Sequence, residues 1–200
     1  MMSSMRYVSI LRWKQAEKLA LRHLLNEDRG RITPLIEITP KSFDAPKAGK
    51  KEGKKPDPRQ VLEDHAKELL ENWQYAPFFL DFCLMDDLMP VIDDAHHPLV
   101  YIAEIAQRFK LHLIPVVGLK REDEYTSAVS RVVHLSGRGI CLRVLAKEAA
   151  QSTFAQRVRT MLKKLELNEG NADLLLDYQA VDPQEPDLKT LLAKIPRLDE

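Results

Sequence analysis

The sequence predicts an α/β fold built from six consecutive strand-then-helix units. Three observations predict it. The apolar runs expected to be strands show no polar alternation, as is typical of strands in a covered parallel sheet. Amphipathic segments with helical periodicity separate these runs. Four of the runs carry one ionisable residue near their C-terminal end, namely Glu37, Asp81, Arg143 and Asp177.

The bulk composition limits the class of protein. Two hundred residues suit one ordinary domain, and we expect residues 1–200 to form a single barrel-like domain. With 30 basic and 30 acidic residues, the bulk charge does not favour nucleic acid. No apolar run approaches the roughly 20 residues that span a bilayer, and the N-terminus lacks the apolar core of a signal peptide. We therefore expect a cytoplasmic protein in which Cys83 and Cys141 are buried, reduced thiols.

The first two strands are expected close to the N-terminus. Residues 7–14 form an apolar run that predicts a strand, and they continue directly into a helical pattern at 15–25. Gly30 marks the end of this helical stretch. A second apolar run at 32–38 predicts the next strand, which carries Glu37.

A basic segment at 41–59 comes next. It contains seven Lys or Arg residues and three prolines and shows no period, which predicts a mobile loop. Asp57 and Pro58 are the residue types of a helix N-cap and first turn. The helix that follows is expected to bury one side, formed by Val61, Leu62, His65, Leu69 and Trp73.

The remaining units repeat the pattern. Further strands are expected at 78–84, 111–118, 139–145 and 173–179. Further helices are expected at 98–110, 121–135, 149–167 and 187–195. Pro115 stands in the middle of one predicted strand, where it cannot donate a ladder hydrogen bond, so we expect a bulge or a strand end there.

Two arrangements of a parallel sheet fit this order: a (β/α) barrel like the TIM barrel, and an open doubly wound sheet. The charged strand ends favour the barrel, because all strands of a barrel end at one mouth. In an open sheet, only the ends beside a switch point meet. A barrel needs eight units and about 250 residues. We therefore expect six of the eight units, in a barrel that is incomplete at its C-terminus.

Five charged residues are expected to ring this mouth. Glu37, Asp81 and Asp177 are candidate catalytic residues and candidate ligands of Mg²⁺ or Mn²⁺, because hard cations prefer carboxylate oxygens. Lys14 and Arg143 are candidate ligand-binding residues that would bind phosphoryl oxygens. This set predicts a phosphorylated or nucleotide-like ligand. An enzyme with this set would be a metal-dependent phosphoester hydrolase, in which a metal-bound water attacks.

The same residues allow a structural interpretation. Ion pairs such as Lys14–Glu37 or Asp81–Arg143 would close the mouth without any chemistry. A six-stranded sheet also leaves an exposed strand edge, and such edges are normally paired or blocked. The alternative function is therefore a non-enzymatic interaction protein, completed by a partner chain or by self-association. The basic segment 41–59 would overhang the mouth and offers a site for nucleic acid, although it lacks aromatic residues for base stacking.

Several of these segments resemble a known family. Residues 7–14, together with the run at 32–38, are similar to the opening of the phage beta-protein family. Further matches lie at Asp81, 114–119, 140–143 and 175–177, so the resemblance runs along nearly the whole chain. It implies a barrel-like fold and a phage, prophage or antiviral-defence setting. Members are typically longer, so the resemblance also implies that a C-terminal part is missing here.

Overall fold

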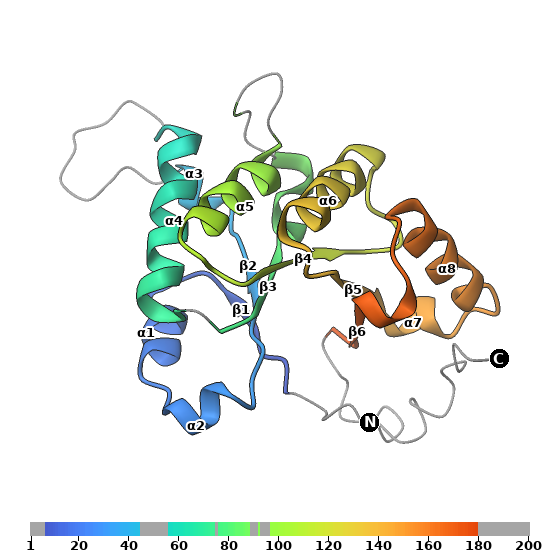
Figure 1. Cartoon of the computed structure of the whole chain (residues 1–200), viewed down its shortest axis with the longest axis horizontal. Helices are drawn as coiled ribbons and strands as arrows, with labels where there is room; N and C mark the ends of the chain where they lie inside the picture. The colour runs from blue at the N-terminus through green and yellow to red at the C-terminus, as the bar shows by residue number, and fades with distance from the viewer. Residues whose placement is uncertain (1–6, 45–55, 75, 89–91, 93–96, 180–200) are drawn as a thin grey trace.

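The computed structural model describes residues 7–44, 56–74, 76–88, 92 and 97–179. Its centre is one sheet of six parallel strands in sequential order. The strands are β1 (Ile10–Arg12), β2 (Leu35–Glu37), β3 (Phe78–Asp81), β4 (Leu113–Val117), β5 (Ile140–Leu145) and β6 (Ala172–Asp177). Figure 1 shows that this sheet is curled into a half-barrel, with β1 and β6 as its two edges.

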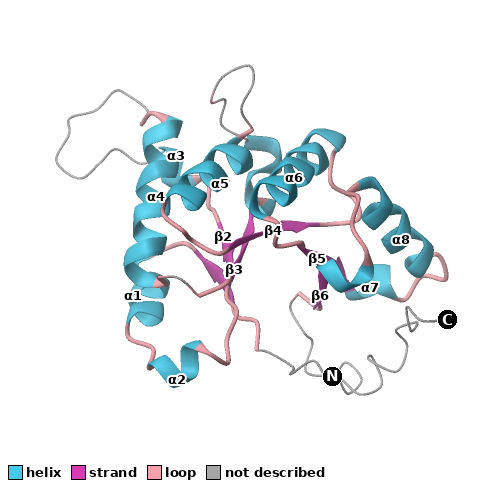
Figure 2. Cartoon of the chain, viewed as in Figure 1, coloured by secondary structure: helices cyan, strands magenta, loops and turns pink. Residues whose placement is uncertain are grey.

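The helices surround the sheet on its outer side (Figure 2). They are α1 (Gln15–Arg22), α2 (Asn26–Arg29), α3 (Lys41–Asp44), α4 (Pro58–Asn72), α5 (Pro98–Arg108), α6 (Asp123–Ser136), α7 (Ala146–Ala149) and α8 (Phe154–Lys164), with 3₁₀ turns at Cys83–Leu88 and Glu169–Asn171. Within the described part of the chain, none of these helices has the length and apolar character needed to cross a membrane.

The strand order decides between the two expected arrangements. A doubly wound sheet reverses its strand order at a switch point and carries helices on both faces. Here the order is sequential and the helices cover the outer face only, so the doubly wound alternative is wrong. The curled parallel sheet with outer helices agrees with the barrel-like expectation, while closure into a barrel of eight units stays a prediction.

Most expected elements are present, with two differences, and two expected segments lie outside the described residues. The helix cap at Asp57 is confirmed, because its carboxylate accepts a hydrogen bond from Arg59 N at 3.0 Å. The first residues of the expected loop 41–59 instead form α3, and residues 45–55 lie outside the described residues. The expected helix 149–167 is shorter in the structure, where α8 covers 154–164, and a turn separates it from the short helix α7 before it. The expected helix 187–195 lies outside the described residues.

Pro115 marks a change of partner within β4. The residues up to Pro115 pair with β3, and the residues from Val116 onward pair with β5. The missing N–H therefore falls where pairing with β3 ends and pairing with β5 begins. β4 continues to Val117, so the expected strand end does not form at Pro115. The strands β3, β4 and β5 diverge in direction at this point (Figure 1).

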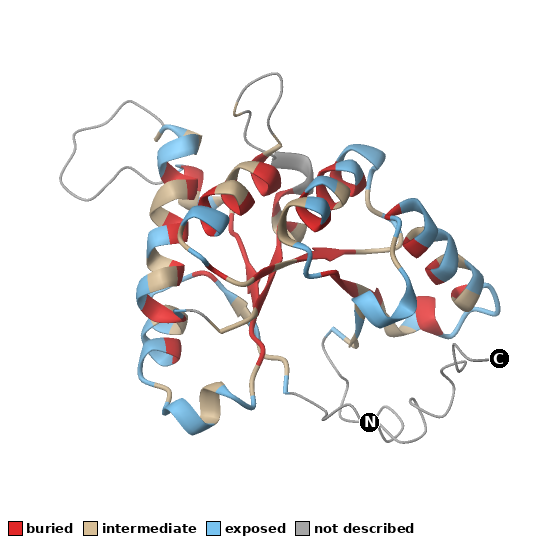
Figure 3. Ribbon diagram, in the orientation of Figure 1, coloured by how far each residue is buried: buried red, intermediate tan, exposed pale blue. Residues whose placement is uncertain are grey.

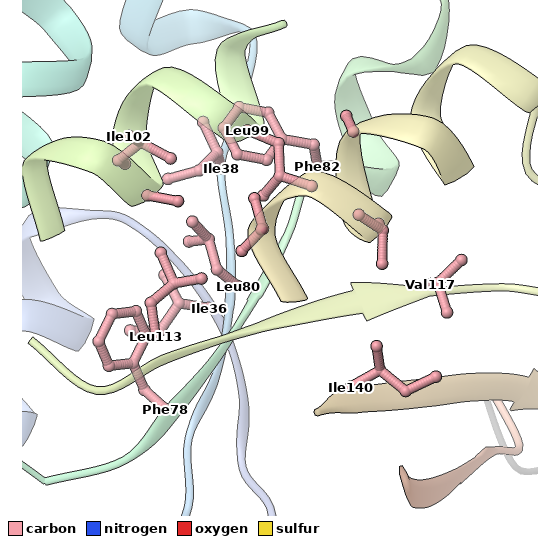
Figure 4. Packing of buried hydrophobic residues seen from close by; sticks show 14 of the residues in the cluster. Ile36, Ile38, Phe78, Leu80, Phe82, Leu99, Ile102, Leu113, Val117 and Ile140 are labelled. Carbon is pink, nitrogen blue, oxygen red and sulfur yellow. The ribbon is translucent and has the colours of Figure 1, made fainter. Parts of the chain in front are cut away.

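The two faces of the sheet have different neighbours. Strand residues such as Ile36, Leu80 and Val117 point outward and pack against the helices in the main core (Figure 4). A smaller cluster fills the inner face, formed by Leu35, Phe79, Val116 and Cys141. Figure 3 shows the strands β2 to β5 as mostly buried, while the helices expose their outer sides.

This alternation places the charged residues. Side chains two positions apart on a strand share a face. Glu37 and Asp81 therefore lie on the inner face, two residues beyond Leu35 and Phe79. Arg143 likewise lies two residues beyond Cys141. The polar layer thus caps the inner apolar cluster at the C-terminal ends of the strands, the edge that we call the mouth.

Candidate functional site

Strand register brings the mouth residues to one level. Arg12 pairs with Glu37, and Glu37 pairs with Asp81, across three neighbouring strands. Arg143 lies on β5, and Asp177 is the last residue of β6. Because the strands are parallel and the sheet curls, side chains from β2, β3, β5 and β6 can reach a common point.

Arg143 occupies that point. Its Nη1 donates to Glu37 Oε1 and to Asp81 Oδ2, each at 2.8 Å. Its Nε donates to Asp177 Oδ2 at 2.8 Å, and its Nη2 lies 2.7 Å from the same oxygen. One guanidinium therefore joins carboxylates from three other strands.

Two further residues belong to this site. Arg121, in the loop after β4, donates through Nη2 to Asp81 Oδ1 at 2.6 Å and stacks over the Tyr125 ring at 4.6 Å. The backbone N of Cys83 donates to the same Asp81 oxygen at 2.8 Å. Asp81, whose side chain is fully buried, thus has both oxygens hydrogen bonded. Its burial is compensated by these donors.

The thiol of Cys83 lies inside the charged layer. It donates to Glu37 Oε1 at 3.4 Å and accepts from Arg143 Nη1 at 3.3 Å. Burial and the charges of Asp81 and Glu37 raise the pKa of Cys83 far above its ordinary value. The thiol therefore stays protonated at neutral pH and is not activated as a nucleophile.

Arg143 is held in its charged form. Burial works against the charge, but the hydrogen bonds to Glu37, Asp81 and Asp177 outweigh it and raise the pKa of Arg143. The Arg143 side chain is still 19% exposed, whereas that of Asp81 has no exposed surface. Of these two side chains, that of Arg143 is therefore the one that solvent reaches.

Lys14 is the one expected mouth residue that the structure does not bring to the cluster. β1 ends at Arg12, and Lys14 is an exposed residue at the start of α1. Arg12 takes its place beside Glu37, with Nε 3.8 Å from Oε2. Of the two suggested ion pairs, Asp81–Arg143 is formed. Among the described residues, Lys14–Glu37 is not.

The expected Mg²⁺ or Mn²⁺ site does not fit this arrangement as it stands. The carboxylates of Glu37, Asp81 and Asp177 converge on the Arg143 guanidinium, which fills the position that a shared cation would need. Within the described ranges, no group of three or more His, Cys, Asp or Glu side chains is arranged to hold a metal ion. The metal stays a prediction that this geometry does not favour.

Exposed lysines follow the C-terminal ends of four strands. They are Lys14 after β1, Lys41 after β2, Lys120 after β4 and Lys147 after β5. Lys120 Nζ lies 3.1 Å from Oε1 of the buried Glu148. These lysines follow the strand ends at which the neutralised charge layer lies, although Glu122 and Asp123 come soon after Lys120 in the sequence.

The sequence did carry a signal for some of the missed residues. Arg12 has the same strand parity as the inner-face residue Ile10, so it could have been placed beside Glu37. Cys83 and Arg121 lie in connections, where no period fixes the direction of a side chain. Only their position after β3 and β4 hinted that they would lie near the mouth.

The comparisons with known proteins bear on the whole chain. A family model described as Beta protein matches residues 7–200. The comparisons with curated proteins and with solved structures found no match. The family match covers nearly the full sequence and confirms the resemblance found in the strand segments. The chain therefore belongs to the Beta protein family.

Proposed function

We propose that the protein binds a phosphorylated or nucleotide-like ligand at the mouth. The observation that carries this proposal is Arg143, whose side chain is partly exposed and whose guanidinium is held by three carboxylates at the C-terminal strand ends. Ligand sites of parallel (β/α) sheets lie at this end of the strands. A planar guanidinium in a fixed orientation is well suited to phosphate oxygens.

The hydrogen bonds of Arg143 leave room for such a ligand. Nε and both hydrogens of Nη1 are directed at carboxylates. Nη2 carries two hydrogens, and among the described residues Asp177 Oδ2 is the one acceptor that it contacts. The carboxylates therefore orient the guanidinium, and a hydrogen on Nη2 stays available to donate to a phosphate.

The balance of charge supports an anion over a cation. Glu37, Asp81 and Asp177 are offset by Arg143 and Arg121, with Arg12 beside Glu37. The floor of the mouth is thus nearly neutral. The lysines that follow β1, β2, β4 and β5 then add positive charge around it, which attracts an anion and raises its local concentration.

Catalysis by Glu37, Asp81 and Asp177 remains part of the proposal. Glu37 is the most suitable base of the three, because the one contact of its Oε2 among the described residues is with Arg12, at 3.8 Å. The oxygens of Asp81 and Asp177 accept shorter hydrogen bonds. The phage, prophage or antiviral-defence setting and a cytoplasmic location are likewise proposed.

Calorimetric titration with inorganic phosphate and with ADP, each with and without Mg²⁺, tests the proposal. Arg143→Lys keeps the charge but loses the planar fork, so we expect affinity to fall roughly tenfold or more. The double variant Lys14→Gln/Lys147→Gln removes only exposed charges and is expected to weaken binding without affecting folding. The matched control is Arg22→Gln/Lys163→Gln. These two residues lie in the last turns of α1 and α8.

Two results would contradict the proposal. One is the absence of binding heat with either ligand to a natively folded wild-type chain. The other is binding that the control pair weakens as much as the mouth pair does. A response that requires Mg²⁺ would in addition support the metal prediction.

A second candidate function rests on the sheet edges. Among the described strands, β1 and β6 each have a neighbour on one side only. Ile10 on β1 is 41% exposed and Leu174 on β6 is 39% exposed. An exposed edge with apolar side chains suits a partner chain or a second copy. Sedimentation velocity tests this: a monomer that is unaffected by Leu174→Lys over a wide concentration range would contradict self-association.

A further inference from the structure

A separate cavity lies at the opposite end of the sheet from the mouth. It has a volume of about 290 Å³ and lies where α5 and α6 end and β4 begins. The two helices lie side by side (Figure 1), and Gln107 Nε2 donates to Leu135 O at 3.3 Å between them. This cavity shares no residue with the Arg143 cluster.

The walls of the cavity have two kinds of residue. Its apolar wall is formed by Ala103, Ala106, Leu111, Leu113, Val132 and Leu135. Its charged or ionisable residues are Lys110, His112 and Arg138, and none of the described residues that line it is acidic. One side therefore offers apolar contact and the other offers hydrogen-bond donors.

The backbone fixes where the three basic residues stand. Lys110 has a φ of 57° and turns the chain from α5 toward β4. Arg138 lies between Gly137 and Gly139, whose φ values are 64° and 75°. A Cβ at Gly139 would come within 2.0 Å of Asn171 O, so this turn requires glycine. The bases thus come from two tight turns and from the residue before β4.

A simpler explanation covers only part of this arrangement. Cations near helix C-termini interact favourably with the helix dipole, and Lys110 and Arg138 follow α5 and α6. That effect accounts for two charges. The helix dipole does not explain His112, which precedes a strand. It also does not explain the cavity that the three basic residues line.

We infer that this cavity binds a compact organic anion. The charged group of the ligand would contact Lys110, His112 and Arg138, and an apolar body would lie against the apolar wall, to which α5, α6 and the start of β4 contribute. Its volume is close to the lower end of small-molecule pockets, about 300 Å³, which suits a ligand with one ring.

The state of His112 agrees with this inference. Burial, followed by the charge of Arg138, lowers the pKa of His112. The ring is therefore neutral at neutral pH and offers one N–H donor, while Lys110 and Arg138 supply the positive charge.

Phenyl phosphate is a suitable probe, with phenol as the neutral comparison. In two-dimensional amide NMR of the full chain, we expect saturable shifts at residues 110–113 and 137–139 with phenyl phosphate. Phenol should produce much smaller shifts. Lys110→Gln/Arg138→Gln should weaken the interaction roughly tenfold, since two charge-assisted hydrogen bonds are lost.

The control is Lys14→Gln/Lys147→Gln, which removes two exposed charges at the mouth and should leave these shifts unchanged. Both pairs replace exposed residues, so folding is expected to persist. Saturable shifts confined to the C-terminal strand ends would overturn the inference. So would the absence of shifts at 110–113 and 137–139, or equal responses to phenol and phenyl phosphate.

Discussion

Two ion clusters among the described residues have opposite arrangements. At the mouth, one cation, Arg143, is held by three acids from three strands. Between α1 and α4, one acid is held by three donors. Glu68 Oε2 accepts from Trp13 Nε1 at 3.0 Å and from Lys18 Nζ at 2.6 Å, and it lies 3.2 Å from His65 Nδ1.

The difference lies in burial and in spare bonding capacity. The Glu68 side chain is 35% exposed, and its contacts tie a strand end and two helices together. Asp81 is fully buried. Arg143 keeps one hydrogen on Nη2 for which the described residues provide no further acceptor. The comparison teaches that the helix cluster suits a structural role, whereas the mouth cluster combines structural pairing with a remaining donor.

Removal of the central cation should have the largest effect. Arg143→Met would leave Glu37, Asp81 and Asp177 close together without their shared donor, so we expect a loss of about 3–5 kcal/mol in the free energy of unfolding. Urea unfolding measures it. Arg22→Met, on the exposed end of α1, should change stability by no more than about 0.5 kcal/mol. If both variants changed the free energy of unfolding equally, Arg143 would not stabilise the fold more than an exposed arginine does.

Two acids of the mouth cluster should differ from each other. Asp81→Asn loses charged acceptors for Arg143 and Arg121 at a fully buried position, and we expect a loss of about 2–3 kcal/mol. The Asp177 side chain is 11% exposed at the edge strand, so Asp177→Asn should cost only about 1 kcal/mol. Thermal and urea unfolding of both variants provide the measurement. If Asp177→Asn lost more stability than Asp81→Asn, burial would not predict which of the two carboxylates contributes more.

The helix cluster should show a smaller effect that depends on pH. Burial opposes its charge, but hydrogen bonds from His65 and Lys18 lower the pKa of Glu68 from 4.5 to about 2. Ionised Glu68 therefore adds stability that is fully present above pH 4.5 and is lost as the pH falls toward 2. The stability difference between wild type and Glu68→Gln should shrink over this window. Urea unfolding at several pH values checks this, and a constant difference would contradict it.

The fold was largely predictable because its signals are periodic. Near-continuous apolar runs separated by amphipathic helices predicted the parallel sheet. The five residues predicted for the buried side of α4 are buried, while Ala66 and Asn72, also buried, were not predicted. The interruption between α7 and α8 was missed, because Phe154 and the residues after it keep the same helical period. Pro115 was noticed, but its role depends on which strand pairs with which residue, and that is a tertiary property.

The candidate site was predictable where it lies on strands. Glu37, Asp81, Arg143 and Asp177 were expected at one mouth, and the structure brings them into contact. Lys14 was misplaced because the apolar run continues beyond the hydrogen-bonded strand, so the strand end was set two residues too late. The directions of side chains in the loops, such as Arg121, depend on packing that no local pattern encodes.

The sequential strand order has a consequence for the chain during its synthesis. Each new strand adds beside the preceding one, so the half-barrel can grow from β1 onward as the chain emerges. Glu37 is synthesised 106 residues before its partner Arg143. Until β5 emerges, its neighbouring base is Arg12, at a longer distance. We therefore expect a ribosome-bound chain that ends before Arg143 to keep a loose, protease-sensitive mouth, and the addition of β5 to order it.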